Sequence, residues 1–153
     1  MMLTYKNIDT EFPEIAAIHA QSFAGEWSEK TLLDMFDKGQ YSGSLLLTDG
    51  QVIGFIICAV VLDEAEIISI AISPQERGKT HAAQLLSFEI NRLVNLNITK
   101  LYLEVNEANI AAIKLYKGQN FSQTAVRKNY YKLTNGQRAN ALVFSLNLGK
   151  CLT

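Results

Sequence analysis

Residues 101–116 bring two side chains suited to proton transfer close together in the sequence, a carboxylate and a phenol. Residues 101–105 have the alternation of a buried strand that carries Glu104, and residues 109–119 are expected to form a helix that carries Tyr116. A carboxylate that accepts a proton and a hydroxyl that donates one suit a reaction at a carbonyl group placed between them. Each residue also has a plainer interpretation, since a lone glutamate is most often solvent-exposed and a lone helical tyrosine often belongs to the core.

Residues 70–83 have the pattern of an anion-binding connection between a strand and a helix. Residues 77–79 (Arg-Gly-Lys) precede a helix that is expected to begin near Thr80. Free backbone N–H groups and the positive dipole end of a helix start, with flanking cations, suit a pyrophosphate. A plain connection whose cations face water is the alternative. A P-loop is rejected, because that motif requires a glycine where Ser73 stands.

Length and composition indicate one compact domain, residues 1–153, with a substantial core. Fourteen Lys and Arg against fifteen Asp and Glu leave a net charge of −1, which argues against a general polyanion binder. We therefore expect no direct nucleic-acid partner. The longest apolar run, residues 54–62, is too short to cross a bilayer as a helix, so no membrane partner is expected.

The cysteines and histidines indicate neither a disulfide framework nor a metal site. Cys58 lies in an apolar stretch and is expected to be an inert buried thiol, whereas Cys151 lies near the C-terminus. The absence of a disulfide pattern favours a reducing, cytoplasmic location. His19 and His81 have no partner at ligand spacing, so no metal is predicted. We expect His19 to be structural and His81 to lie at the start of the helix.

The expected elements follow the order β-α-α-β-β-β-α-β-α-β-β, which predicts an α/β (α+β) mixed sheet flanked by helices. Proline 13 suits the first turn of a helix, Ser28 suits a helix N-cap, and Asp49-Gly50 is typical of a hairpin turn. The expected ranges are strand 3–7, helices 13–23 and 29–37, strands 45–48, 52–62 and 65–72, helix 80–93, strand 100–105, helix 109–119, and strands 121–126 and 139–146.

Five motifs occur in an order and at spacings typical of one enzyme family. They are FxxEWSEK at 23–30, VLDEAEIISIAI at 61–72, LYLEV at 101–105, NxxAxxLY at 109–116 and RKNYY at 127–131. With these motifs the chain resembles the GNAT (Gcn5-related) N-acetyltransferases over nearly its whole length. It is most similar to members that acetylate the N-terminal alanine of a ribosomal protein. The resemblance implies the GNAT fold, acetyl-CoA as co-substrate and a protein N-terminus as the acceptor.

The resemblance also implies a role for each matching residue. Glu104 corresponds to the proton acceptor that deprotonates the incoming amine, and Tyr116 to the proton donor for the departing CoA thiolate. The strand that pairs with the pantetheine arm, one of whose N–H groups would polarise the thioester carbonyl, comprises Ile70, Ala71 and Ile72. The other cofactor-binding positions are Arg77, Gly78, Lys79, Thr80, His81, Ala82, Ala83 and Asn109. The positions that border the acceptor groove are Trp27, Tyr130 and Tyr131.

Three departures from the family pattern affect these expectations. Thr80 stands at the central glycine position of the pyrophosphate loop, although threonine resists a positive φ. Asn120 replaces the glycine usual before Phe121, and asparagine tolerates the left-handed conformation, so the helix can still end there. Asn106 and Glu107 stand where an Arg–Ser-like pair is common, which would alter the choice of acceptor.

The acceptor amine is the least determined part of this interpretation. At pH 7 about a tenth of α-amines are neutral, against a few in ten thousand lysines, so a single carboxylate base suits an N-terminal amine. A lysine or a small-molecule amine remains an alternative acceptor. An acyl-CoA-binding regulatory module without turnover is a second alternative. The expected assembly is a monomer or a weak dimer.

Overall fold

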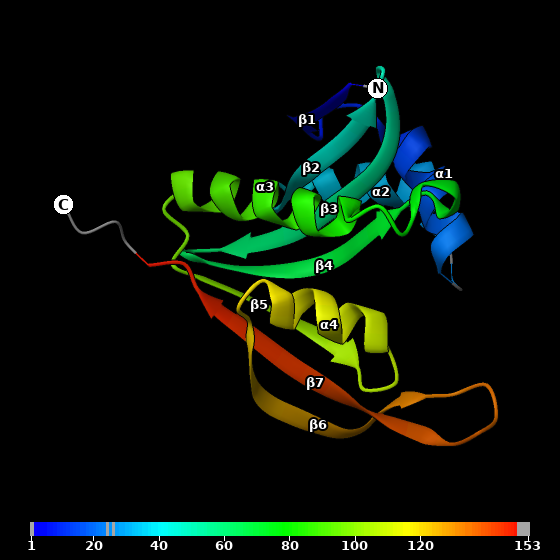
Figure 1. The fold of residues 1–153 in the computed structure, drawn as a ribbon, viewed down its shortest axis with the longest axis vertical. Coiled ribbons are helices and arrows are strands. Elements are labelled where there is room, and N and C mark those ends of the chain that lie inside the picture. The colour runs from blue at the N-terminus through cyan, green and yellow to red at the C-terminus, as the bar shows by residue number, and fades with distance from the viewer. Residues whose placement is uncertain (1, 24, 26, 150–153) are drawn as a thin grey trace.

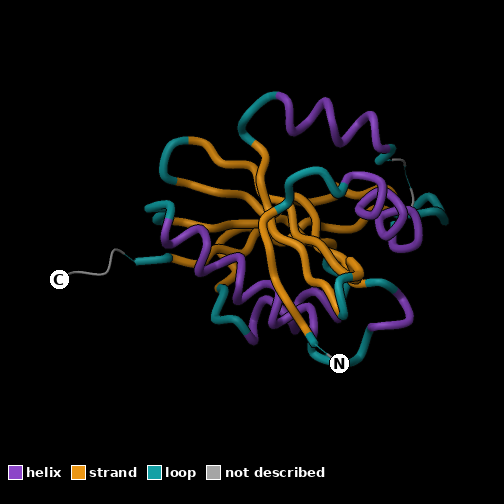
Figure 2. The backbone as a smooth tube through the Cα atoms, turned by 90° about the horizontal axis from the view of Figure 1, so that it is seen from above, coloured by secondary structure: helices purple, strands orange, loops and turns teal. Residues whose placement is uncertain are grey.

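The computed structural model describes residues 2–23, 25 and 27–149, so Glu26 of the first motif and Cys151 lie outside the described residues. Seven strands form one mixed sheet in the order β1-β2-β3-β4-β5-β7-β6, with helices on both of its faces (Figures 1 and 2). The elements are β1 (Leu3–Asn7), α1 (Phe12–Ser22), α2 (Glu29–Asp37), β2 (Tyr41–Thr48), β3 (Gln51–Val61), β4 (Glu64–Ile72), the short 3₁₀ helix η1 (Pro74–Glu76), α3 (His81–Asn95), β5 (Lys100–Asn106), α4 (Ile110–Gly118), β6 (Ser122–Lys132) and β7 (Arg138–Asn147).

The predicted mixed sheet and the predicted order of its elements are confirmed, but two strands are longer than expected. β2 begins at Tyr41 rather than at residue 45, and β6 continues to Lys132 rather than ending at residue 126. β6 is one of the two edge strands, and ten of its eleven residues are exposed. An exposed edge strand has no buried face, so its sequence lacks the apolar alternation on which the shorter range was based.

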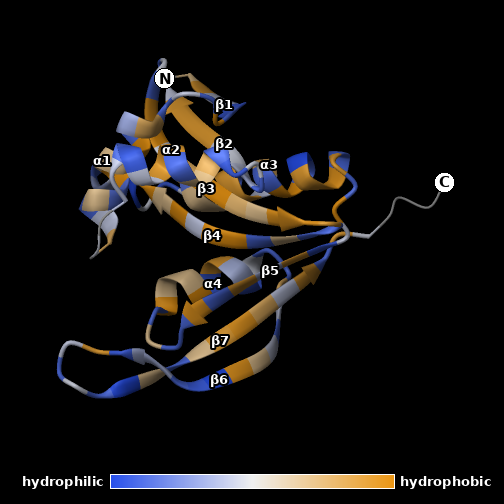
Figure 3. Ribbon diagram, turned by 180° about the vertical axis from the view of Figure 1, so that it is seen from behind, coloured by the Kyte–Doolittle hydropathy of each residue, from blue (hydrophilic) through white to orange (hydrophobic). Residues whose placement is uncertain are grey.

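Two apolar cores lie on opposite faces of the sheet. One core packs beneath α1 and α2 and includes Ile15 and Leu32. The other packs beneath α3 and α4 and includes Leu86, Leu103 and Tyr116. In Figure 3, apolar residues are concentrated in β2 and β3, and the far end of the β6–β7 hairpin is mostly polar.

Several local signals act as their residue types predict. The Ser28 hydroxyl accepts a hydrogen bond of 3.1 Å from the Thr31 N–H and caps α2. Asp49 and Gly50 both have positive φ, as a tight hairpin turn requires. Asn120 follows Gln119, the C-cap of α4, and has a φ of 69°, so asparagine adopts the left-handed region after this helix as expected.

The chain before α1 is held by the carboxylate of Glu11. Its Oε1 accepts hydrogen bonds from the N–H groups of Asp9, at 2.8 Å, and Thr10, at 3.0 Å, and its Oε2 pairs with the Lys6 ammonium. Partial burial pushes the pKa of Glu11 upward, but the bonds from Lys6 and from these N–H groups outweigh it and lower the pKa to about 2.

A buried polar cluster joins α3 to β2 and β3. Glu89 is fully buried, and its carboxylate accepts two 2.7 Å hydrogen bonds from the Arg92 guanidinium and one of 2.6 Å from the Ser44 hydroxyl. Arg92 also donates to the Ser42 hydroxyl at 3.0 Å. The Cys58 thiol lies beside this cluster, and burial followed by the charge of Glu89 raises its pKa well above the ordinary value. Cys58 is therefore the buried, protonated thiol that was expected.

The sheet divides between its fourth and fifth positions. β4 and β5 are parallel, and they pair only at their first three residues, from Glu64 and Lys100 to Glu66 and Tyr102. Beyond this point each strand keeps its other neighbour, because β3 pairs with β4 to Ile72 and β7 pairs with β5 to Asn106. A register shift between β3 and β4 marks the bend, since a β-bulge redirects the strand that carries it. The ends of β4 and β5 therefore diverge, as Figure 1 shows.

Candidate active site

A cavity of about 340 Å³ lies in the split between β4 and β5, and both proposed proton-transfer residues line it. Its walls come from the diverging strand ends, from α4, from the end of β6 and from the segment after α1. The lining residues are Phe23, Ile67, Ile68, Ser69, Ile70, Leu103, Glu104, Val105, Asn106, Asn109, Ala112, Tyr116 and Tyr131. The split is therefore open to a ligand rather than sealed by side chains.

A second cavity of about 390 Å³ continues from the first toward the start of α3. The residues that line both cavities are Phe23, Ile70, Asn109, Ala112 and Tyr116. Ile72, Arg77 and Ala82 line only the second one. The two cavities together form a trough from the loop before α3 to Glu104, and we call it the split trough.

Glu104 reaches the split trough from one face of β5. Its neighbours Leu103 and Val105 are buried on the opposite face, in the core beneath α3 and α4. The Glu104 side chain is 19% exposed, and its Oε1 lies 2.9 Å from Nε of Arg127 on β6. The carboxylate is thus neither buried in the core nor free in water, and it already has one cationic partner.

Tyr116 reaches the split trough from the other face, on α4. Its ring is 5% exposed and packs edge-on against Phe121, with the ring centroids 5.5 Å apart. Within the described part of the chain, its hydroxyl has no hydrogen-bond partner. Burial, with a smaller effect of the nearby Cys58 thiol, raises the pKa of Tyr116 to about 12. The phenol therefore remains protonated at neutral pH and has an O–H available for a ligand.

The edge of β4 that faces the split has the form of an unfilled strand position. Ile70, Ala71 and Ile72 pair with β3 on one side, but beyond Glu66 they have no strand partner on the β5 side. An extended ligand with amide groups can hydrogen-bond to such an edge as an added strand would. The predicted pantetheine-binding residues therefore lie where they could pair with such an arm.

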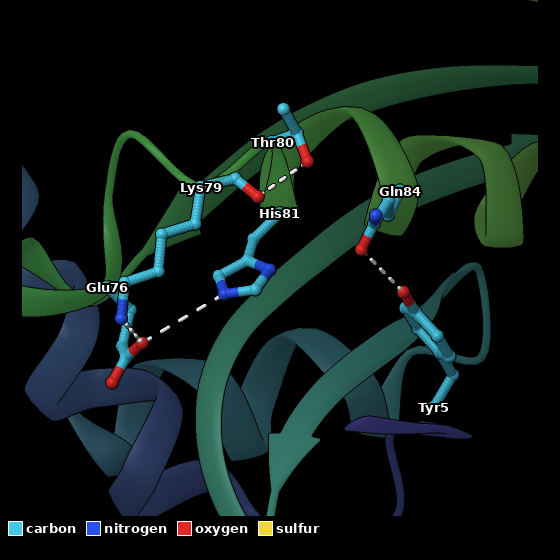
Figure 4. Close-up of polar contacts among 6 residues, drawn as sticks. All are labelled: Tyr5, Glu76, Lys79, Thr80, His81 and Gln84. Carbon is cyan, nitrogen blue, oxygen red and sulfur yellow. Dashed lines mark hydrogen bonds and ion pairs between the residues drawn. The ribbon is translucent and has the colours of Figure 1, made fainter. Parts of the chain in front are cut away.

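The loop before α3 presents a group of unpaired N–H donors. Gly78 and Thr80 have φ values of 79° and 65°, and α3 begins at His81. The N–H groups of residues 78–83 donate to no carbonyl and no side chain among the residues that the structure describes. Thr80 adopts a left-handed conformation although threonine resists a positive φ, and its hydroxyl turns back to donate to the Lys79 carbonyl (Figure 4). These donors and the dipole of a 15-residue helix suit an anion.

The cations of this loop bond within the protein. Lys79 pairs with Glu76 at 2.9 Å (Figure 4). The Arg77 guanidinium donates to the Ile72 carbonyl at 3.0 Å and to the Ser22 hydroxyl at 2.9 Å, which ties the loop to the ends of β4 and α1. Arg77 thus supports the wall of the split trough, and its contact with a phosphate remains a prediction.

His81 and Asn109 lie at the starts of the two helices that flank the split trough. His81 is 5% exposed, and neither ring nitrogen has a hydrogen-bond partner in the described chain, although Nε2 is 3.9 Å from Oε2 of Glu76. Asn109 caps α4, since its Oδ1 accepts a 3.1 Å bond from the Ala112 N–H. Asn109 also lines both cavities of the split trough, so the residue that caps α4 also borders the proposed ligand site.

The residues predicted to border the acceptor groove lie in different surroundings. Tyr131 lines the cavity beside Glu104, and Tyr130 is 49% exposed next to it, with the two rings edge-to-face at 5.1 Å. Trp27 does not line either cavity, and it stacks on His19 with ring centroids 4.5 Å apart. His19 is buried in that stack, consistent with the structural role expected for it.

Two residues of this site were not singled out from the sequence. Phe23 lines both cavities although it is 42% exposed, and Arg127 pairs with Glu104. Both belong to motifs that were recognised, FxxEWSEK and RKNYY. Nothing in those motifs indicates that Arg127 approaches Glu104, because the pairing depends on the order in which β5, β7 and β6 join the sheet.

Comparison with known proteins agrees with this geometry. The sequence profile of the acetyltransferase (GNAT) family matches residues 12–121. The [ribosomal protein bS18]-alanine N-acetyltransferase of Haemophilus ducreyi is 34% identical over 142 residues, which cover 92% of this chain and 97% of that protein. The crystal structure of the ribosomal-protein-S18-alanine N-acetyltransferase from Escherichia coli superposes with a TM-score of 0.88 at 33% identity, covering 99% of both chains.

A more distant structure shows the same fold with the donor molecule bound. A phosphinothricin acetyltransferase from Sinorhizobium meliloti, solved in complex with AcCoA, has a TM-score of 0.85 at 22% identity and covers 98% of this chain and 90% of its own. The chain therefore belongs to the GNAT family and is an N-acetyltransferase. No helix in the described part of the chain is long and apolar enough to span a membrane.

Proposed function

We propose that this enzyme transfers the acetyl group of acetyl-CoA to a protein N-terminal α-amine, the N-terminal alanine of a small-subunit ribosomal protein. The observation that carries the proposal is the meeting of Glu104 and Tyr116, from opposite faces of the sheet, in one cavity of the split. The relatives named for this activity support it over about nine-tenths of the chain. Such an acceptor implies work in the cytoplasm, and we propose that the protein acts as a monomer or a weak dimer.

The split trough fits acetyl-CoA, which supplies an activated acetyl group when it is bound. The unpaired N–H groups of residues 78–83 would hold the pyrophosphate, and the unpaired edge of residues 70–72 would hold the amide-containing arm. Asn109 and Ala112 line the continuous path between these two positions. An N–H group of this β4 edge would also polarise the carbonyl group under attack.

Glu104 would prepare the acceptor for attack. An N-terminal amine is mostly an ammonium ion at pH 7, and a carboxylate within hydrogen-bond reach can remove its proton, directly or through one water molecule. Glu104 lines the split on the face that carries Tyr131, which suits an acceptor that enters from the side of the β6–β7 hairpin. The neutral amine can then attack without any covalent bond to the enzyme.

Tyr116 would act on the leaving thiolate. Its hydroxyl has no hydrogen-bond partner among the residues described, and it faces the cavity from α4. The phenol stays protonated because burial raises its pKa to about 12. It can therefore stabilise a negative sulfur atom by donating a hydrogen bond to it.

The proposal is tested by thiol release with peptides that differ only in their first residues. We expect an alanine-start peptide to release thiol faster than its N-terminally blocked form with one internal lysine. Glu104→Gln should reduce the rate of release by about 10²–10⁴ while acetyl-CoA binding is retained. Faster reaction of the lysine peptide would favour the alternative acceptor. Binding of acetyl-CoA without thiol release for any amine would favour a regulatory module, and a wild-type rate for Glu104→Gln would remove this residue from the mechanism.

A further inference from the structure

Arg127 occupies the side of the Glu104 carboxylate that faces the β6–β7 hairpin. Its Nε lies 2.9 Å from Oε1 of Glu104. The two residues are not on neighbouring strands, because β7 lies between β5 and β6. Glu104 stands opposite Val143, and Arg127 stands opposite Ala141, two residues before Val143 in β7. The arginine therefore reaches diagonally across β7, over the small side chain of Ala141, to the proposed base.

An irregular stretch of β6 holds Arg127 in this position. The β6–β7 register shifts between Arg127 and Tyr131, and Asn129 between them has a φ of 55°. The Asn129 N–H donates to the Asn140 side chain at 3.0 Å, which anchors the bulge to β7. The bulge folds Tyr130 back so that its ring centroid is 5.3 Å from the Arg127 guanidinium carbon. The arginine thus has two neighbours, a carboxylate and an aromatic ring.

The charges around this pair leave the site attractive to a cation. Burial raises the pKa of Glu66, the charge of Glu104 raises it further, and Arg127 opposes that effect. Glu66 and Glu104 are thus two carboxylates close enough to influence each other, and among the residues described Arg127 forms an ion pair with Glu104. Arg127 is 57% exposed, so its bond to Glu104 is screened by water and can open at little cost.

We propose that Arg127 is a displaceable cation that takes the position of the acceptor's ammonium group on Glu104 and thereby sets acceptor affinity. This inference rests on the proposed role of Glu104. A general base must lie about 2.6–3.2 Å from the atom that carries the proton it removes, and Nε of Arg127 already lies at that distance from Oε1. A guanidinium cannot give up its proton at neutral pH, so Arg127 can occupy this position but cannot replace the substrate. When the acceptor displaces the Arg127 guanidinium from Glu104, the guanidinium can keep its cation–π contact with the Tyr130 ring.

Arg127→Gln tests the proposal, with Lys128→Gln as the matched control. Lys128 is the next residue, carries the same charge, is exposed and has no ion pair among the residues described. An exposed ion pair favours its closed form by a factor of roughly two to five. We therefore expect the KM of Arg127→Gln for an alanine-start peptide to fall about two- to fivefold, with kcat within about twofold of wild type and unchanged acetyl-CoA affinity. The KM of Arg127→Lys should stay close to that of wild type.

Two further measurements separate this role from others. The difference in KM between wild type and Arg127→Gln should shrink as the salt concentration is raised, because an exposed pair is screened. In calorimetric titration of a CoA-loaded enzyme, the same peptide should bind more tightly to Arg127→Gln than to wild type. In a Glu104→Gln background, Arg127→Gln should no longer change the affinity for the peptide, because the carboxylate that both cations need is absent.

Either of two kinetic outcomes overturns the proposal. A loss of kcat of tenfold or more at unchanged KM would make Arg127 a residue that orients Glu104. Unchanged KM, kcat and peptide affinity, or equal effects of Arg127→Gln and Lys128→Gln, would leave only a surface ion pair. If wild type releases no thiol with any peptide, the proposed function fails, and the calorimetric titration still decides whether Arg127 competes with an N-terminal ammonium.

Discussion

Replacement of Tyr116 by phenylalanine removes one oxygen atom from the split trough and leaves the packing of the ring in place. The ring is 5% exposed and lies edge-on to Phe121 at 5.5 Å, and the substitution keeps both features. Within the described chain the hydroxyl makes no hydrogen bond, so its loss leaves no partner unpaired. We therefore expect the free energy of unfolding to change by less than about 0.5 kcal/mol and Tm by less than about 2 °C.

The size of the catalytic loss follows from the pKa of the phenol. Burial raises this pKa to about 12, whereas an ordinary thiol has a pKa of about 8.5. Complete proton transfer to a thiolate is therefore unfavourable by about 3.5 units, or about 5 kcal/mol. A hydrogen bond to a charged group contributes about 1.5–3 kcal/mol without such a transfer. Tyr116→Phe should accordingly slow thiol release by roughly 10- to 150-fold.

The assay is single-turnover thiol release between pH 6 and 9, with Tyr102→Phe as the control. Burial also raises the pKa of Tyr102, but this residue lies outside the split trough and lines a different surface hollow beside Glu66. Tyr102→Phe should keep the wild-type rate. Normal turnover of Tyr116→Phe across this pH range would refute the donor assignment, and a loss near 10⁴-fold would show that complete proton transfer occurs despite the raised pKa.

Three further predictions concern stability. Arg92→Leu should lower the free energy of unfolding in urea by about 3–5 kcal/mol, because the Glu89 carboxylate is left buried without its cation, and Glu89→Leu in the same chain should restore most of the loss. A loss below about 1 kcal/mol would contradict this. Thr80→Gly should raise Tm by about 1–4 °C. The substitution removes left-handed strain of about 1–2 kcal/mol, which exceeds the entropic cost of about 0.5–1 kcal/mol of ordering a glycine. Asn120→Gly should give no gain, and equal shifts would argue against strain at Thr80. Because the pKa of Glu11 is lowered to about 2, its contribution to stability is complete above about pH 4.5 and is lost as pH falls toward 2. The stability difference between wild type and Glu11→Gln should therefore vanish over that window, and a difference independent of pH would be inconsistent with a charged Glu11.

Much of the secondary structure could be predicted because its signals are local. The Ser28 cap, the Asp49–Gly50 turn and the left-handed Asn120 each depend on what one or two residues can adopt, and neighbours in the chain suffice to specify them. The lengths of β2 and β6 could not be read in the same way. β6 is an exposed edge strand, and the pairing that defines it comes from β7.

The candidate site could be predicted only in part. Glu104 and Tyr116 were recognisable from the sequence as a carboxylate on a strand and a phenol on the next helix, and they line one cavity. The surroundings of Trp27 were not recognisable, since its stacking on His19 requires α1 and the following segment to fold together. Phe23 likewise enters the wall of the cavity only because the end of α1 lies against the split.

The sequence by itself determined which groups are available: a carboxylate on a strand, a phenol on a helix, and a loop with a glycine and two cations before a helix start. Only the tertiary structure decided how they meet. β4 and β5 separate beyond Glu66, which lets side chains from opposite faces share one cavity. The sheet order places Arg127 on Glu104 although 22 positions separate them in the chain. Residue types and local conformations depend on near neighbours, whereas an opening between strands and a contact across β7 depend on the pairing of distant segments.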